Sequence, residues 1–269
     1  MTYYTSARSL LLACVLASSL AGFVRADNWP QWRGPANDGV STETNLPTRW
    51  GQDENIAWSL PMPGMAGSTP IVWDDRIFLT SADGNNDLWI LCVSTAGKTL
   101  WKHKLGNARV KTMGNEGNGA SASPSTDGKH VWAFVGSGDF TCFTLDGKEI
   151  WHFNAQERYG KFRIQFGMHT TPVLYGDRLY MQLIHSGGAR VIALNKNTGK
   201  TVWNVARPSD GVKECEHSYA SPCVWHDGGK AYLITHGNDY AIAHRLEDGR
   251  EIWRVGDLNP KNRYNYTLR

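Results

Sequence analysis

The sequence predicts an all-β propeller built of four-stranded antiparallel blades, of which the chain contains about four. Two observations carry this prediction. A strand-ending motif recurs four times at a nearly constant spacing, and a serine- or threonine-proline pair recurs in phase with it. The composition agrees, because 12 Trp and 28 Gly with only 20% charged residues favour many short strands and tight turns.

The first 26 residues predict a secretory signal peptide that is cleaved after Ala26. Arg8 gives a positive start, residues 10–24 are mostly apolar, and residues 24–26 (Val-Arg-Ala) fit the pattern that signal peptidase accepts. A membrane anchor is less favoured, because spanning a bilayer needs about 20 apolar residues. A lipoprotein signal at Cys14 is less favoured because the apolar stretch continues past it. We therefore expect a periplasmic or secreted protein without a transmembrane helix in its mature part.

The charge balance argues against a nucleic-acid partner. The chain has 28 basic and 25 acidic residues, and removal of the leader takes away Arg8 and Arg25 but no acidic group. The mature chain is therefore almost neutral, with no basic stripe and no acidic tail. Neither nucleic acid nor an anionic membrane surface is an expected partner.

The strand-ending motif reads Gly, basic, variable, aliphatic, Trp, and it is expected to form the last strand of each blade. It begins at Gly97, Gly147, Gly199 and Gly249 and ends at Trp101, Trp151, Trp203 and Trp253. The tryptophans are 50, 52 and 50 residues apart. The glycine permits a tight turn with positive φ, and the tryptophan can cover the gap between neighbouring blades, burying on the order of 200 Å². These eight residues are predicted to dock blades rather than to contact a cofactor.

The remaining strands follow from the second landmark. A Ser/Thr-Pro pair precedes the first strand of each unit at residues 69–70, 123–124, 171–172 and 221–222. The second strands are expected at residues 76–80, 130–135, 178–183 and 231–235, each followed by a turn rich in Gly, Asp or Asn and then by a third strand. Each sheet has two faces to bury, so the sheets should stack radially. An open sandwich does not explain the constant period.

Two cysteines, Cys92 and Cys142, each lie nine residues before a repeat tryptophan and so occupy equivalent places in neighbouring blades. Packed sheets lie about 10 Å apart, whereas the Cα atoms of a disulfide are roughly 4.4–6.8 Å apart. Buried free thiols are therefore expected. For Cys215 and Cys223 the sequence leaves open whether a disulfide forms.

The repeat resembles the pyrroloquinoline-quinone-like (PQQ-like) repeat of quinoprotein dehydrogenases and of the outer-membrane assembly factor BamB. Residues 28–41 (Asn-Trp-Pro-Gln-Trp-Arg-Gly-Pro-Ala-Asn-Asp-Gly-Val-Ser) resemble the start of exported propeller proteins abundant in planctomycete-like bacteria. Residues 159–162, 258–260 and 267–269 resemble the same group. The resemblance covers nearly the whole mature chain and implies a ring of seven or eight blades.

That implied ring sets the expected domain boundaries. Residues 27–60 form an N-terminal extension, in which residues 55–60 around Trp58 resemble an isolated, ring-closing last strand. Blades are expected at about residues 61–105, 106–155, 156–206 and 207–256, with a truncated fifth blade from residue 257. Because seven or eight blades of about 50 residues need more chain, we expect a truncated or split reading frame. Such a chain should be poorly soluble or self-associate.

Polar residues that precede the Ser/Thr-Pro pairs are the candidate ligand-binding residues. By repeat phase they lie near the channel mouth, and they are Asn118, Ser121, Gln165, His169, Glu216, His217, Ser218 and Tyr219. Convergent side chains of these types can bind a metal or a small ligand. The favoured alternative is that they only satisfy the backbone of their own loops. No residue is predicted to be catalytic, and no metal site is assigned.

The resemblance implies a non-catalytic scaffold or binding module of the cell envelope, similar to BamB, with another envelope protein as its partner and no cofactor. The alternative is a fragment of a PQQ- and calcium-dependent quinoprotein oxidoreductase. Such dehydrogenases use a tryptophan floor, an adjacent Cys-Cys pair, Glu and Asn calcium ligands and an Asp base. This sequence has no Cys-Cys pair and no matching Glu, Asn and Asp set. A third possibility is a product without independent function.

Overall fold

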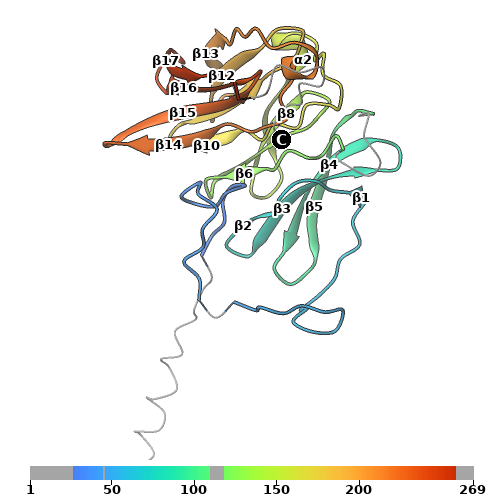
Figure 1. Ribbon diagram of the computed structural model, residues 1–269. Coiled ribbons are helices and arrows are strands. Elements are labelled where there is room, and N and C mark those ends of the chain that lie inside the picture. The colour runs from blue at the N-terminus through green and yellow to red at the C-terminus, as the bar shows by residue number, and fades with distance from the viewer. Residues whose placement is uncertain (1–26, 45, 110–117, 259–269) are drawn as a thin grey trace, which may run out of the picture.

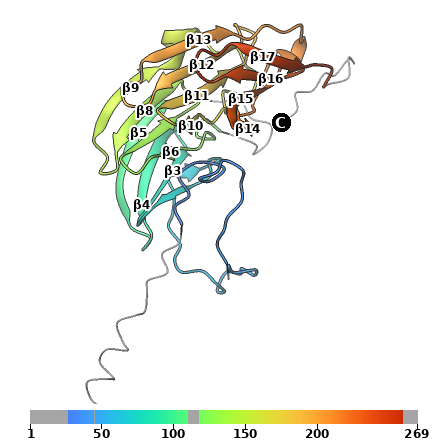
Figure 2. The same ribbon diagram turned by 90° about the vertical axis from the view of Figure 1, so that its left-hand side faces the viewer.

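The computed structural model describes residues 27–44, 46–109 and 118–258. The strands of this part form four antiparallel sheets that stand side by side along an arc (Figures 1 and 2). Each sheet contains one predicted repeat, which confirms the propeller blades. The predicted leader and the fifth blade from residue 259 on lie outside the described residues. No helix in the described part is long and apolar enough to cross a membrane.

Within each blade the strands follow one another from the inside of the arc to the outside. Blade one contains β2 (Ile71–Trp73), β3 (Arg76–Asp83), β4 (Asp87–Ser94) and β5 (Thr99–Asn107). Blade two contains β6 (Ser125–Thr126), β7 (His130–Phe134), β8 (Asp139–Thr144) and β9 (Glu149–Asn154). Blade three contains β10 (Val173–Tyr175), β11 (Arg178–Leu183), β12 (Arg190–Asn195) and β13 (Thr201–Ala206). Blade four contains β14 (Cys223–Asp227), β15 (Lys230–Gly237), β16 (Tyr240–Arg245) and β17 (Glu251–Val255).

Three short elements were not predicted, and one of them is the 3-10 helix η1 (Lys213–Glu216). Strand β1 (Gly64–Met65) pairs with β3 beyond the end of β2, which gives blade one a fifth strand. Helix α2 (Ala155–Tyr159) follows β9, and the Asn154 side chain accepts hydrogen bonds from the first N–H groups of this helix. Asn is a favoured helix N-cap, so this local bond explains why the chain turns into a helix there.

The repeat glycines turn out to have two roles. Gly97, Gly147, Gly199 and Gly249 have φ values of +78°, +84°, +64° and +76°, which confirms the predicted tight turn. A Cβ atom at any of these positions would also come within 2.6–2.9 Å of a tryptophan ring. The rings belong, in the same order, to Trp58, Trp101, Trp151 and Trp203. Each tryptophan therefore packs on the glycine turn of the following blade.

Each docking tryptophan is also hydrogen-bonded to the blade on which it packs. The indole N–H groups of Trp58, Trp101, Trp151 and Trp203 donate to the carbonyl oxygens of Thr95, Leu145, Lys196 and Leu246 at 2.7–3.0 Å. Trp58 thus occupies the docking position against blade one, although residues 55–60 belong to none of the four sheets. Its ring-closing role stays a prediction. Trp253, at the other end of the arc, is 37% exposed, whereas Trp203 is 8% exposed.

The Ser/Thr-Pro landmark links the inner strands of neighbouring blades. The backbone N–H of Thr69 donates to Oγ of Ser123 at 2.9 Å, and the N–H of Ser123 donates to Oγ1 of Thr171 at 3.1 Å. The N–H of Thr171 donates in turn to Oγ of Ser221 at 2.8 Å. The Ser or Thr side chain is therefore required, because its hydroxyl oxygen accepts a hydrogen bond from the backbone N–H of the equivalent residue one blade earlier. This chain of hydrogen bonds crosses all four blades.

Three hydrophobic cores fill the junctions between blades. The first joins blades one and two around Ile71, Phe78 and Val131, and the second joins blades two and three around Phe134 and Met181. The third joins blades three and four around Tyr180 and Leu233. Apolar residues on both faces of a sheet are thus buried, as radial stacking requires.

The cysteines in the described part are free, and Cys92 and Cys142 are fully buried, as predicted. Burial raises the pKa of both thiols to about 12, so they remain protonated at neutral pH. Cys215 and Cys223 are also free, which answers the question that the sequence left open.

An N-terminal strap, residues 28–37, crosses the inner strands of the first three blades (Figure 1). Trp29 forms an antiparallel bridge with Val72, with both N–H···O distances at 2.9 Å. The Pro30 carbonyl accepts from the N–H of Thr126 at 2.8 Å, and Oε1 of Gln31 accepts from the N–H of Leu174 at 3.3 Å. The strap therefore ties blades one, two and three together at the centre of the arc.

Candidate functional site

The predicted site residues lie in the loops that lead from the last strand of one blade into the first strand of the next. We call the end of the propeller that carries these loops the entry-loop face. The turns between the second and third strands lie on the same face, because strands alternate in direction. The turns between the first and second strands lie at the opposite end, where the strap runs.

Asn118 and Ser121 stabilise their own loop. Oγ of Ser121 donates to the Asn118 carbonyl at 2.8 Å, and Oδ1 of Asn118 accepts from the N–H of Ala120 at 2.8 Å. Oγ1 of Thr80 holds the same loop on blade one by donating to the Ala120 carbonyl at 2.8 Å. These contacts agree with the alternative that the polar side chains satisfy loop backbones.

Ser218 joins blades three and four. Its Oγ donates to the His236 carbonyl at 2.7 Å and accepts from Nε2 of Gln182 at 3.1 Å. Gln182 is buried, and its side chain also bonds both backbone groups of His236. Glu216 and His217 directly precede Ser218, and both are half-buried. The buried Gln182–Ser218 pair thus fixes the base of the blade-four entry loop.

His169 and Tyr219 are brought together from two different blades. Their ring centroids are 6.0 Å apart, and Phe166 lies 6.0 Å from the same Tyr219 ring. Nε2 of His169 is hydrogen-bonded to the Phe166 carbonyl. Gln165, next to Phe166 in the sequence, is exposed. Residues 165, 166, 169 and 219 therefore form a mixed aromatic and polar group, which we call the junction cluster.

His185 belongs to the neighbourhood of this site, although it was not among the predicted site residues. It is buried in the turn after β11, and its Nδ1 accepts from the N–H of Gly187 at 3.0 Å. Burial, together with the positive charges of Arg190, His217 and Arg163, lowers the pKa of His185 to about 4. Its position in the turn between the second and third strands could have pointed to it, because these turns lie on the entry-loop face.

These surroundings do not fit calcium. A calcium ion takes six to eight oxygen ligands from carboxylates, carbonyl groups and water. The charged groups that act on His185 are cationic. Among the described residues, no three or more His, Cys, Asp and Glu side chains are grouped so that they could hold a metal ion. The arrangement can hold an uncharged or anionic surface group of a partner by aromatic packing and hydrogen bonds.

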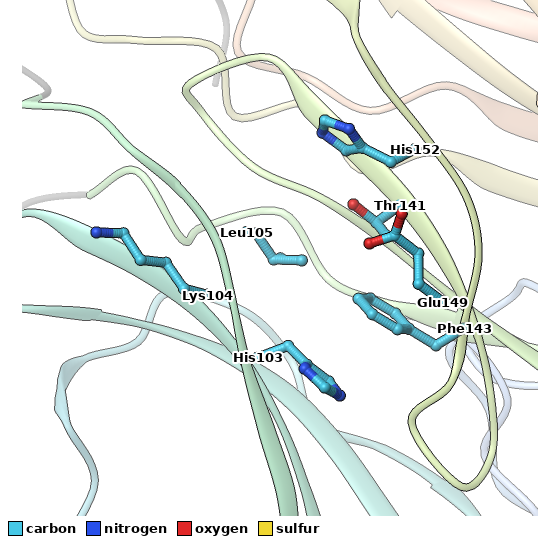
Figure 3. Close-up of a pocket in the computed structure, with 7 residues that line it drawn as sticks. All are labelled: His103, Lys104, Leu105, Thr141, Phe143, Glu149 and His152. Atoms are coloured by element: carbon cyan, nitrogen blue, oxygen red, sulfur yellow. The ribbon is translucent and has the colours of Figure 1, made fainter.

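A groove of about 350 Å³ separates blades one and two on their outer side (Figure 3). His103, Lys104 and Leu105 of β5 face Thr141, Phe143, Glu149 and His152 of β8 and β9 across it. The His103 ring stacks on Phe143 with centroids 5.1 Å apart. Nε2 of His152 lies 3.0 Å from Oδ1 of Asp139, and Nζ of Lys104 lies 2.8 Å from Oδ1 of Asp87. Lys104 and His152 are thus already paired.

A second cavity, of about 380 Å³, lies between the strap and the inner strands of the four blades. Its lining includes Asn37, Trp73, Asp127, Tyr175, Lys196 and His226. Nζ of Lys196 and Oδ2 of Asp127 form an ion pair at 2.9 Å. Burial alone would raise the pKa of Asp127, but hydrogen bonds from Lys196 and from backbone N–H groups outweigh burial and lower it. The sequence did not indicate this cavity, because the strap reaches it only through long-range contacts.

The fold and its repeats define a PQQ-like repeat β-propeller. A family model described as "Outer membrane protein assembly factor BamB" matches residues 86–265, more than half of the chain. The chain therefore belongs to this family.

Two curated relatives are quinoprotein ethanol dehydrogenases. The one from Pseudomonas putida is 25% identical over 237 residues, which cover 76% of this chain and 36% of that protein. The one from Pseudomonas aeruginosa is 30% identical over 139 residues, which cover 45% of this chain and 22% of that protein. The chain thus spans only about a third or less of the length of these relatives.

Among solved structures, the quinohemoprotein alcohol dehydrogenase from Comamonas testosteroni is similar with a TM-score of 0.65 and 16% identity. The match covers 92% of this chain and 43% of that one. A europium-containing methanol dehydrogenase matches with a TM-score of 0.58 and 15% identity, over 86% of this chain and 50% of that one. At such identities the likeness shows the fold alone.

Proposed function

We propose that this protein is a non-catalytic binding module of the cell envelope, exported to the periplasm or the exterior, and that the junction cluster engages another envelope protein. The observation that carries the proposal is the convergence of His169, Phe166 and Tyr219 from two blades. Aromatic side chains are enriched at protein interfaces, where they bury a large area at a low cost in side-chain entropy.

The rigidity of the cluster supports the same function. The buried Gln182 and Ser218 anchor the loop that carries Tyr219 to both blades. A preorganised surface binds more tightly, because less conformational entropy is lost on association. The hydrogen bonds of Asn118, Ser121 and Ser218 are made within the protein. Gln165, in contrast, is exposed and can reach a partner. Membership of the BamB family supports an envelope partner.

Site-specific photo-crosslinking in the cells that make the protein tests this proposal. A photoreactive amino acid at position 165 should yield one discrete adduct with an envelope protein, and the Tyr219→Ala variant should lose it. A matched probe at position 129, exposed in a turn at the opposite end of the blades, should not yield it. The same yield at both positions, or none at position 165, would sink the proposal.

The second candidate is part of a quinoprotein oxidoreductase, and the specific observation that favours it is the 25–30% identity to two quinoprotein ethanol dehydrogenases. The purified chain is titrated with PQQ and calcium, and ethanol-dependent dye reduction is followed. Saturable quinone binding with calcium-dependent dye reduction would favour this candidate. A flat titration and no dye reduction would favour the binding module.

A further inference from the structure

We infer that the cavity between the strap and the inner strands binds a neutral saccharide. The cavity is lined by Tyr175 and Gly176, at the end of β10 that is farther from the entry loop. It therefore lies at the opposite end of the blades from the junction cluster. This inference therefore does not depend on the proposed function. The volume of about 380 Å³ lies in the range of roughly 300–1,000 Å³ that is typical of ligand pockets.

Every blade contributes to the cavity, which makes it a convergent site. Trp73 comes from blade one, Asp127 from the turn of blade two, Tyr175 from blade three and His226 from blade four. The strap covers these inner strand ends and adds Asn37. Such a site forms only when the four blades and the strap are assembled.

The aromatic lining offers a surface for the apolar C–H face of a sugar ring. The Tyr175 ring lies 5.6 Å from the His226 ring, and its hydroxyl is 3.1 Å from Nε2 of His226. Tyr175 is partly exposed, so its ring remains accessible to a ligand. Tyrosine and tryptophan suit amphipathic ligands because each joins an apolar ring to a polar group.

The polar lining favours an uncharged ligand. Asp127 and Lys196 neutralise each other in the ion pair, so the cavity presents an acceptor and a donor without a net charge. Adjacent hydroxyl groups of a pyranose match such a pair, since each hydroxyl both donates and accepts. A charged ligand would have to compete with the existing pair.

A buried donor supplies the independent observation. Nδ2 of Asn37 is buried and has no hydrogen-bond partner among the described residues. A buried unsatisfied amide costs about 1–3 kcal/mol. Asn37 lies in the left-handed region with φ of +58°, and it is one of the residues that line the cavity. A sugar hydroxyl would satisfy this group once the amide turns toward the cavity.

Calorimetric titration of the full chain with cellobiose, maltose and N-acetylglucosamine tests the inference. At least one of these sugars should bind saturably. Tyr175→Ala removes the ring and should abolish binding, whereas Tyr175→Phe keeps it and should weaken binding less. Asn37→Gly keeps the left-handed turn but removes the donor, and should weaken binding about tenfold, as expected for one hydrogen bond.

Asn86→Gly is the matched control. Asn86 has φ of +63° and lies exposed in a turn of blade one, outside the cavity, so this variant should bind as the parent does. The melting temperature of each variant checks that the fold is kept. No binding of the three sugars, or equal binding by the parent and Asn37→Gly, would overturn the inference. Cross-linking at position 165 should not change in Asn37→Gly, which separates this test from that of the proposed function.

Discussion

The buried imidazole of His185 should make stability depend on pH. Its pKa is about 4 in the folded protein and about 6.5 when exposed. The unfolded chain therefore binds more protons between these values, and stability is lost as the pH falls from about 6.5 to 4. The difference between the two pKa values corresponds to roughly 3 kcal/mol. Burial also lowers the pKa of His236 and of His244, which adds to the same trend.

The His185→Asn variant tests this prediction by urea unfolding at pH 7 and pH 4.5. The Asn side chain can still accept from the N–H of Gly187 but does not titrate. We expect a smaller difference in unfolding free energy between the two pH values than in the parent. An unchanged difference would show that other groups cause the pH dependence.

The inter-blade hydrogen bond at Thr171 permits an equally direct test. Thr171→Val leaves the buried N–H of Ser123 without its acceptor, which should lower the unfolding free energy by about 1–3 kcal/mol. Thr171→Ser retains the oxygen and should cost less. If the two variants were equally stable in chemical denaturation, the hydroxyl chain would not contribute to stability.

At the scale of single residues, the sequence predicted the place of a residue in the repeat better than the role of its side chain. Repeat phase predicts that Asn118, His169 and Ser218 lie near the channel mouth, and each of them precedes the first strand of its blade. It could not show that Ser218 is used internally, because that depends on Gln182 from the neighbouring blade. It also did not select His185, whose pKa is lowered by burial and by charges that include Arg163 and His217, both distant in the sequence.

At the scale of single elements, the docking turn predicts different costs for two glycine substitutions. Gly199→Ala must accept φ of +64° and also places Cβ 2.8 Å from the Trp151 ring. Gly228→Ala meets a similar φ of +53° but no atom within 4 Å. Backbone strain alone should cost about 1 kcal/mol, and the clash should add to it at Gly199. Equal melting temperatures would contradict the docking role of this glycine.

The docking tryptophans allow a comparison within one chain. Trp203→Ala should cost about 3–5 kcal/mol, because it removes a buried ring and the hydrogen bond to Leu246. Trp253→Ala removes a ring that is much more exposed and should cost clearly less. Denaturant unfolding of both variants measures the difference. A loss as large for Trp253 would show that burial between blades is not the cause.

The period of the repeat was sufficient to predict the four strands of each blade, their order and the tight turns. It was not sufficient for β1, α2 or the strap. Strand β1 has two residues, and α2 depends on one Asn154 cap. The strap bonds Trp29 to Val72, a contact that no local pattern reveals. The strap cavity was therefore invisible in the sequence.

At the scale of the whole molecule, blade four exposes an apolar surface. Trp225, Trp253 and Val255 are all partly exposed on β14 and β17. Large exposed apolar patches favour association, so we expect the described arc to self-associate. Val255→Lys should shift sedimentation toward the monomer. A parent chain that sediments as a single monomeric species at all concentrations would contradict this expectation.

Function is hardest to predict at the scale of the whole molecule. The family match and the relatives share one fold, and fold alone does not decide between a binding module and an oxidoreductase. The distinction depends on what the junction cluster contacts. The contacts of the junction cluster can be measured by cross-linking, because the cluster consists of known residues.

The cross-linking yield from position 165, compared between the parent and Tyr219→Ala, tests the central claim most directly. Our account predicts one envelope adduct for the parent, a strong loss in the variant with an unchanged melting temperature, and no adduct from position 129. A parent chain without any adduct at position 165 that reduces dye with PQQ, calcium and ethanol would contradict it.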